Sequence, residues 1–292
     1  MPVSTHELLS LLDLEALDQD LFRGSQPRTT WQRTFGGQVL AQCLVAASRT
    51  VEGRRLHSLH ANFLRPGSND APIIYDVERM RDGRTFSTRL VRARQHGQVI
   101  FSSNLSFKSS EPGLDHSDPM PQELPHPESC RPLVDVLEQL AGASLPSIWR
   151  ADALDVRYIG QPDADGQPTG PRSHATHMRL WVRSTGTLPM DPVVHQAILA
   201  YLSDISLLAV AVIPHAAALR SGMAVAPASV DHGMWFHRPA RADEWLLYDE
   251  VSPSASDALG FSMGRLMQGG KLVASCSQEG LLRLIDPADH QA

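Results

Sequence analysis

The 292-residue sequence has few cysteines and no pattern that would use them. Cys43, Cys130 and Cys276 form neither an even disulfide set nor a metal-ligand spacing, which favours a reducing compartment and buried, structural thiols. No basic segment followed by an apolar core occurs near the N-terminus, so no signal peptide is expected, and the last residues do not match a peroxisomal address. We therefore expect a cytoplasmic protein.

The sequence also lacks an excess of positive charge. Its formal net charge is −6 at pH 7, which argues against nucleic acid or an anionic membrane as the main partner. One apolar run, residues 197–213, approaches transmembrane length, but Ser203, Asp204 and Ser206 near its centre make it a poor membrane span. With 42% hydrophobic residues the chain can bury a large core. We expect a globular protein with a small-molecule partner and no membrane insertion.

Asp204 is the most informative residue, because it lies in the middle of this apolar run. A helix that is apolar on nearly every side is buried, and a carboxylate inside it is costly unless it is partnered or used. Asp191 can cap the first turn, Pro192 suits the first helical position, and Pro214 stops the run. The pattern predicts a central helix that carries one acid, which is either functional or a satisfied carboxylate at a helix edge.

The sequence contains an internal repeat. Residues 57–66 and 230–239 share a Phe-x-Arg-Pro pattern, and six identities occur at one constant offset of 173. They are the pairs Phe63 and Phe236, Arg65 and Arg238, Pro66 and Pro239, Tyr75 and Tyr248, Gly97 and Gly270, and Ser102 and Ser275. Each copy follows an apolar helix candidate, residues 37–47 in the first copy and residues 197–213 in the second. The repeat predicts two units, each a helix followed by several strands.

Alternating patterns predict strands in both units. Residues 97–107 and 271–278 are matching strands, and residues 176–183 form the first strand of the second unit. Residues 112–171 hold ten of the 21 prolines, which indicates a linker with one short helix near residues 133–140. The prediction is an α+β protein with an N-terminal unit at 1–111, including a leading helix, a linker at 112–171 and a C-terminal unit at 172–292.

Two motifs suggest other chemistry but lack the necessary context. Gly260-Phe-Ser-Met-Gly264 matches a nucleophile elbow, yet it lies between strand patterns with only His290 downstream, so Ser262 is expected in a strand or turn. The pairs His57-x-x-His60 and His174-x-x-His177 have no carboxylate or cysteine at a ligand spacing. We expect no metal, no cofactor and no covalent serine intermediate.

Two further motifs remain to be placed. Gly36-Gly37 is either loop filler or the start of a helix whose N-terminal amides polarise a carbonyl oxygen. Asp231-His232 resembles an acid and base pair, but adjacent strand residues point to opposite faces, so it is interpreted as structural.

Five segments together resemble one known family. They are Phe22-Arg-Gly24, Phe35-Gly-Gly-Gln-Val-Leu-Ala-Gln42, residues 57–67, Asp231-His-Gly-Met-Trp-Phe-His-Arg-Pro239 and Gln278-Glu-Gly280. This set resembles acyl-CoA thioesterase II, the double hotdog family of acyl-CoA hydrolases, from about Phe22 to Leu284. The resemblance implies two hotdog units in one chain, each a long central helix wrapped by an antiparallel sheet. It also implies hydrolysis of acyl-CoA thioesters to free fatty acid and CoA.

The resemblance also implies the site residues. The family's aspartate and glutamine match Asp204 and Gln278, and Ser229 stands where the family has threonine, keeping the hydroxyl but not the methyl. Water can attack a thioester directly if it is held and partly deprotonated, so Asp204 is the expected base, with Ser229 and Gln278 completing a hydrogen-bond cage. In the first unit Ala46 and Leu105 replace the acid and the amide. We expect one active site per chain and a structural role for the first unit.

Two alternatives remain open. One is a non-catalytic acyl-CoA-binding module that kept the pocket, and the other is a hotdog enoyl-CoA hydratase or dehydratase, which would need a histidine and acid pair facing the substrate β-carbon. Hotdog units usually pair and leave sheet edges exposed, so a homodimer or homotetramer is expected.

Overall fold

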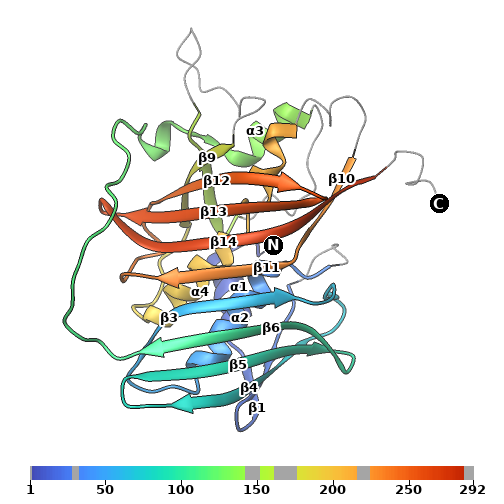
Figure 1. The fold of residues 1–292 in the computed structure, drawn as a ribbon, viewed down its shortest axis with the longest axis vertical. Coiled ribbons are helices and arrows are strands. Elements are labelled where there is room, and N and C mark those ends of the chain that lie inside the picture. The colour runs from blue at the N-terminus through green and yellow to red at the C-terminus, as the bar shows by residue number, and fades with distance from the viewer. Residues whose placement is uncertain (1, 28–32, 142–151, 161–175, 216–223, 286–292) are drawn as a thin grey trace.

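The computed structural model describes residues 2–27, 33–141, 152–160, 176–215 and 224–285. Within these residues, fourteen strands form one antiparallel sheet, and α1, α2 and α4 lie on one of its faces (Figure 1). The strand order is β1-β2-β4-β5-β6-β3-β11-β14-β13-β12-β9-β8-β7, with β10 paired to β14. His174 of the second histidine pair lies outside the described residues.

The first half of the chain forms two helices and six strands. They are α1 (Thr5–Leu12), β1 (Glu15–Asp18), β2 (Leu21–Gly24), α2 (Gly36–Ser48), β3 (Arg55–Phe63), β4 (Ile73–Asp82), β5 (Phe86–Gln95) and β6 (Gln98–Lys108). The described residues that follow form η1 (Pro127–Ser129), β7 (Arg131–Pro132), α3 (Leu133–Ala141), β8 (Leu154–Tyr158), β9 (His177–Ser184), α4 (Pro192–Ser203), η3 (Ala209–Ala211), η4 (Ile213–His215), β10 (Ala224–Ser229), β11 (Asp231–Phe236), β12 (Leu246–Ser256), β13 (Leu259–Gln268) and β14 (Lys271–Ile285).

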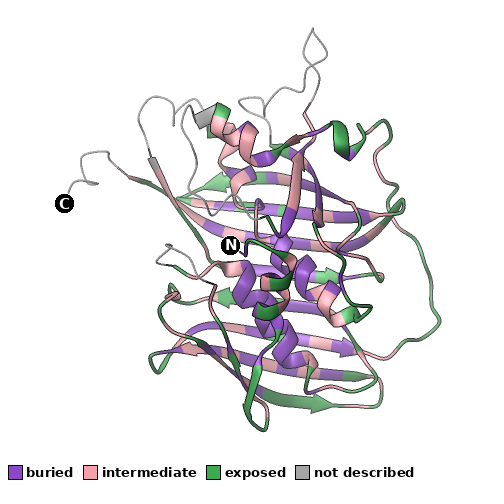
Figure 2. Cartoon of the chain, turned by 180° about the vertical axis from the view of Figure 1, so that it is seen from behind, coloured by how far each residue is buried: buried purple, intermediate pink, exposed green. Residues whose placement is uncertain are grey.

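The two central helices α2 and α4 form the inside of the molecule. Figure 2 shows the molecule from behind, with the central helices coloured largely as buried where they lie against the sheet. Every residue from Gly37 to Ala47 in α2 is buried, which agrees with its nearly all-round apolar sequence. The predicted start of α4 is confirmed, because Pro192 is its first residue and the Val193 amide donates to the Asp191 carboxylate at 2.9 Å.

The predicted end of this helix is wrong. It does not continue to Ile213 but ends at Ser203, and Asp204 is its C-cap residue with φ −95° and ψ −2°. The Tyr248 hydroxyl donates to the Ser203 carbonyl at 2.7 Å and occupies an acceptor that a continuing helix would use. Two short 3₁₀ segments, η3 and η4, follow. Asp204 therefore lies at a helix terminus and not in mid-helix.

The strands β3 and β11 join the two halves at the centre of the sheet. His60 pairs with Gly233, and the flanking pairs are Ser58 with Trp235 and Asn62 with Asp231. The repeat offset of 173 relates these pairs to one another. It makes Asp231 the counterpart of Ser58 and Asn62 the counterpart of Trp235, so the pair Ser58–Trp235 becomes the pair Asn62–Asp231, and the pair His60–Gly233 is unchanged. The outer pairings agree, since Leu56 lies opposite Phe107 in the first half and Ser229 lies opposite Gly280 in the second.

The segment predicted as a linker contains more structure than expected. The short helix is present as α3, but β7 and β8 were not predicted, and β8 extends the sheet by pairing with β9. Residues 142–151 and 161–171 of this segment are outside the described residues. The Gly260-x-Ser-x-Gly264 motif lies wholly within β13, as expected, with buried Ser262 opposite Gln278. None of the described helices is both long and apolar enough to span a membrane.

Candidate active site

The fold brings the three predicted site residues together. Asp204 caps the end of α4, Ser229 is the last residue of β10, and Gln278 lies in β14. One nitrogen of the Gln278 amide, Nε2, donates to Asp204 Oδ1 at 2.7 Å and to Ser229 Oγ at 2.7 Å. Gln278 is fully buried, while Asp204 and Ser229 are partly buried. The amide therefore holds the carboxylate and the hydroxyl side by side at the edge of the core.

The first half of the chain also reaches this site through the N-terminus of α2. The Gly37 amide donates a hydrogen bond to the Asp204 carboxylate. A Cβ on Gly36 would lie 2.7 Å from Asp204 Oδ2, so only glycine allows this close approach. Gly36 is the first residue of α2, so the predicted helix start is confirmed, and the polarised carbonyl oxygen stays a prediction. The expectation that the first half is purely structural is incomplete, since it supplies a hydrogen bond and a helix dipole to the acid.

Burial changes the acidity of Asp204. It raises the pKa of this carboxyl to about 6, against an ordinary value of 3.8, while hydrogen bonds from Gln278, Gly37 and Ser229 lower it. The carboxylate is therefore ionised at neutral pH, but it is a much stronger proton acceptor than an exposed aspartate. A general base works best when its pKa lies near the working pH, and Asp204 meets this condition.

His232 forms one wall of the site. It is buried in β11, and its Nε2 lies 2.9 Å from Ser203 Oγ, on the residue next to Asp204. Because Gly233 pairs with Ser277, the register sets His232 opposite Gln278. Burial lowers the pKa of His232 to about 4, so the ring is neutral at pH 7. The amide of Gln278 raises the pKa of the ring, although His232 Nδ1 and Gln278 Oε1 form no hydrogen bond of normal geometry among the described residues. We infer that His232 holds Gln278 in position and does not act as an acid or base.

Glu250 is a second buried carboxyl near the site. Ser206, two residues after Asp204, donates to Glu250 Oε1 at 2.7 Å, while Oε2 has no hydrogen-bond partner among the described residues. Burial raises the pKa of Glu250 to about 8, so it is largely protonated at neutral pH. It ties the turn after α4 to β12.

A comparison of the two copies of the repeat points to His232 and Glu250. At the offset of 173, four polar residues on the inner face of the second half correspond to apolar residues in the first. These pairs are Ser229 and Leu56, His232 and Leu59, Glu250 and Val77, and Gln278 and Leu105. Buried polar residues that a related copy replaces by apolar ones are not required by the fold, so a comparison of the two copies could have found His232 and Glu250.

The described residues were also compared with the requirements of a metal site and of a disulfide. No group of three or more His, Cys, Asp or Glu side chains among them is arranged to hold a metal ion. The three cysteines are buried and unbridged.

Comparison with solved structures identifies this architecture as a hot dog fold. A hot dog fold protein from Alicyclobacillus acidocaldarius matches with a TM-score of 0.74 at 20% identity, covering 94% of this chain and 97% of its own. A hot dog fold chain that places an acid, a buried amide and a hydroxyl beside a helix N-terminus has the groups needed to activate water.

The sequence comparisons define the family. A family model described as acyl-CoA thioesterase matches residues 155–281, and one described as acyl-CoA thioesterase N-terminal domain matches residues 25–108. Acyl-coenzyme A thioesterase 8 of Mus musculus is 37% identical over 94% of this chain and 88% of its own length. The crystal structure of an acyl-CoA thioesterase II from Mycobacterium marinum has 42% identity and a TM-score of 0.77, covering 94% of this chain and 98% of that chain. The chain belongs to the acyl-CoA thioesterase family.

Proposed function

We propose that this chain hydrolyses acyl-CoA thioesters with Asp204 as the general base, and with Ser229 and Gln278 holding the attacking water. As a member of its family the chain is a thioester hydrolase that acts on acyl-CoA, so the proposal concerns the residues and the chemistry. The observation that carries it is the Gln278 amide, which donates to Asp204 and Ser229 at 2.7 Å each.

The reaction needs few groups because the thioester is already activated. The water oxygen forms a bond to the carbonyl carbon while its proton passes to Asp204, and the carbonyl electron pair moves onto oxygen. When this oxyanion collapses, the carbon–sulfur bond breaks and its electron pair goes to sulfur. The CoA thiolate then takes the proton that Asp204 accepted and leaves as the thiol. The products are the free acid and CoA. Ser229 and Gln278 keep the water and the carboxylate aligned through these steps.

The oxyanion also needs a hydrogen-bond donor. The first amides of α2 have no partner within the helix, and they lie at the positive end of its dipole, next to Asp204. We assign oxyanion stabilisation to this N-terminus, with the Gly36 amide as the donor, because the Gly37 amide already donates to Asp204.

The decisive test of this assignment is Asp204→Asn, assayed by thiol release from an acyl-CoA. We expect a fall in turnover of about 10²-fold or more, the usual scale for losing a general base, with little change in acyl-CoA binding. Near wild-type turnover in the folded variant would contradict the role of Asp204. Release of thiol by the wild type also separates this function from a non-catalytic binding module, and hydration of an enoyl-CoA would favour the hydratase alternative.

The two halves correspond, in this proposal, to two hotdog units with α2 and α4 as their central helices. The self-matching pairing of β3 with β11 and the separate family matches to residues 25–108 and 155–281 support two units related by a pseudo-twofold axis. We keep the N-terminal unit at 1–111. Because β8 pairs with β9, we move the start of the C-terminal unit from residue 172 to just before residue 154.

We also propose that the chain forms a homodimer or homotetramer in the cytoplasm. Three free, buried thiols suit a reducing compartment, and Trp235, Phe261 and Met263 leave apolar surface exposed on the sheet. Sedimentation at micromolar concentrations tests the assembly, and a purely monomeric profile would contradict it. Cell fractionation tests the compartment.

A further inference from the structure

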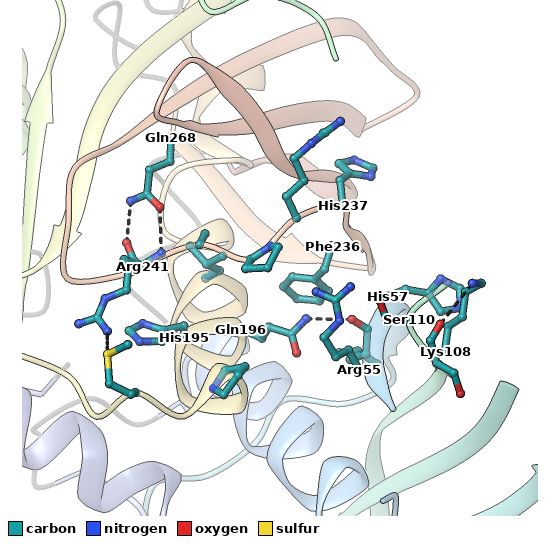
Figure 3. Close-up of a pocket in the computed structure, with 18 of the residues that line it drawn as sticks. Arg55, His57, Lys108, Ser110, His195, Gln196, Phe236, His237, Arg241 and Gln268 are labelled. Atoms are coloured by element: carbon teal, nitrogen blue, oxygen red, sulfur yellow. Dashed lines mark hydrogen bonds between the residues drawn. The ribbon is translucent and has the colours of Figure 1, made fainter. Parts of the chain in front are cut away.

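A pocket lies between the two halves, away from Asp204. It has a volume of about 460 Å³ and is bounded by the first turns of α4, the start of β3, the end of β6 and the segment after β11. In Figure 3, Arg55 and Lys108 lie toward the right of the view, His195 and Arg241 toward the left, and Gln196 between them. Since Asp204 caps the other end of this 12-residue helix, the helix ends are roughly 16 Å apart at ~1.5 Å per residue.

The repeat relates this pocket to the catalytic site. Leu56 lines the pocket at the position that Ser229 has in the second half, and both residues have the same pairing within the sheet. Phe236 lines the pocket as the counterpart of Phe63, which lies against Gly36 near Asp204. The pocket is therefore the first copy's version of the catalytic site, without the acid, the amide or the hydroxyl.

The polarity of the two sites is reversed. At Ser229, His232 and Gln278 the second half is polar where the first half is apolar. At the positions that line the pocket the opposite holds, since the pocket has basic or polar residues where their counterparts are apolar. The pairs, pocket residue first, are Arg55 and Ala228, His57 and Val230, Lys108 and Leu281, Ser109 and Leu282, and His237 and Leu64. In a chain with a net charge of −6, this concentration of cationic side chains in one cavity points to an anionic ligand.

The cations in the pocket differ in how firmly they are paired. Arg241 forms an ion pair with the partly buried Asp243, so this cation is already neutralised within the protein. Lys108 pairs with Glu111, and Arg238 pairs with Asp115, but both carboxylates are well exposed. Arg55 is exposed and forms no ion pair or hydrogen bond through its side chain among the described residues. Because exposed ion pairs contribute only about 0–1 kcal/mol, a phosphate group can replace their carboxylates at little cost.

The pocket also contains a buried donor without a well-formed partner. His195 is 5% exposed, and its Nδ1 accepts from the Ala242 amide at 3.1 Å, so the ring proton is on Nε2. Nε2 has no hydrogen bond of normal geometry among the described residues, although the Pro189 carbonyl interacts weakly with the ring. A buried N–H group in this state is available to a ligand that enters the pocket.

We propose that this pocket binds the phosphate-bearing nucleotide end of a second CoA molecule, which is not hydrolysed there. The choice of CoA rests on the proposed function, because the pocket is the first copy's equivalent of a site for acyl-CoA. Arg55 and Lys108 supply the charge for the phosphates, and the missing acid and amide leave the bound thioester or thiol unreacted. The pocket thus makes the chain responsive to CoA at a position separate from catalysis.

The test is isothermal titration of the full chain with free CoA, comparing wild type with the double variant Arg55→Ala and Lys108→Ala. We expect a second CoA to bind wild type, and its Kd to rise by about tenfold or more in the variant. The matched control is the double variant Arg92→Ala and Arg94→Ala, which removes two exposed, ion-paired cations from β5 outside the pocket. Thermal unfolding of each variant checks that the fold is retained.

Competing ligands identify the chemistry. Adenosine 3′,5′-bisphosphate should displace the second CoA, whereas inorganic phosphate at the same concentration should not. A single CoA per wild-type chain, an equal loss of affinity in the control variant, or equal displacement by inorganic phosphate would overturn the proposal. The catalytic assignment is tested separately, since Asp204→Asn should still bind the second CoA. Retained turnover in that variant refutes the catalytic role while leaving the second binding event unchanged.

Discussion

Replacing Asp204 by asparagine should lower activity and change the pH dependence of stability in the same experiment. Asparagine keeps the shape and the oxygen that accepts from Gln278, but it cannot take a proton from water. A loss of about 10²-fold in turnover corresponds to about 2.7 kcal/mol of transition-state stabilisation. This part of the prediction concerns catalysis alone.

The effect on stability follows from the raised pKa. The carboxyl has a folded-state pKa of about 6 and an ordinary value of 3.8, so the difference corresponds to about 3 kcal/mol. Because the folded pKa is the higher one, this contribution favours folding at low pH and is lost as the pH rises through about 6. The wild type should therefore lose up to about 3 kcal/mol from this residue between about pH 4 and pH 7. The neutral asparagine avoids that loss.

Urea unfolding of both proteins at about pH 4.5 and about pH 7.5 measures this difference. Asparagine places an N–H group where the carboxylate accepted from Gly37, which costs stability at both pH values and cancels in the comparison. We expect the variant to gain stability relative to wild type at the higher pH. A wild-type minus variant difference that is equal at both pH values would refute the buried, ionised carboxylate, whatever the activity.

The remaining predictions test the neighbours of this acid. Ser229→Thr restores the family's residue while keeping the hydroxyl, so turnover should be equal or higher, and a tenfold loss would show that the methyl group does not fit. His232→Leu copies Leu59 of the first half and removes the contact that positions Gln278. The kcat should fall by about tenfold while KM changes little. A rise in KM as large as the fall in kcat would indicate only a structural defect. Gln278→Ala removes a hydrogen bond that lowers the pKa of Asp204, so the acid limb of the kcat/KM profile should move to higher pH, and an unmoved limb would contradict the contact. Glu250→Gln keeps an oxygen for Ser206 and removes a carboxyl whose pKa rises from 4.5 to about 8, so in urea unfolding its stability relative to wild type should be higher at about pH 9 than at about pH 4, and an equal difference at both would contradict the raised pKa.

The parts of the fold that depend on local pattern could be predicted from the sequence. The start of α4 was correct because Asp191 and Pro192 act within one turn of the helix. The extent of α2 was nearly correct because its apolar run and two glycines are contiguous. The meeting of Asp204, Ser229 and Gln278 was predicted only through the family resemblance, since no local pattern relates residues in three separate elements.

The features that were missed depend on contacts between distant segments. The helix that carries Asp204 ends early because the Tyr248 hydroxyl, on β12, takes the carbonyl of Ser203. The amide of Gly37 reaches Asp204 only because α2 and α4 pack against each other with Gly36 at the contact. Strands β7 and β8 lie in a proline-rich segment, where composition argues for a connection and pairing with β9 decides otherwise.

In the two-unit arrangement proposed above, only one of the two units needs to carry the acid. In a symmetric pair every buried polar group occurs twice, and each ionised carboxyl like Asp204 costs about 3 kcal/mol at neutral pH. In this chain Ala46 and Leu105 take the places of Asp204 and Gln278 in the first half, so this cost arises once. The first half is then free to keep α2 for its amides and to change the residues around its own crevice. The basic residues that collect there, Arg55 and Lys108, are the kind of change that a copy released from catalysis can accept without affecting the other site.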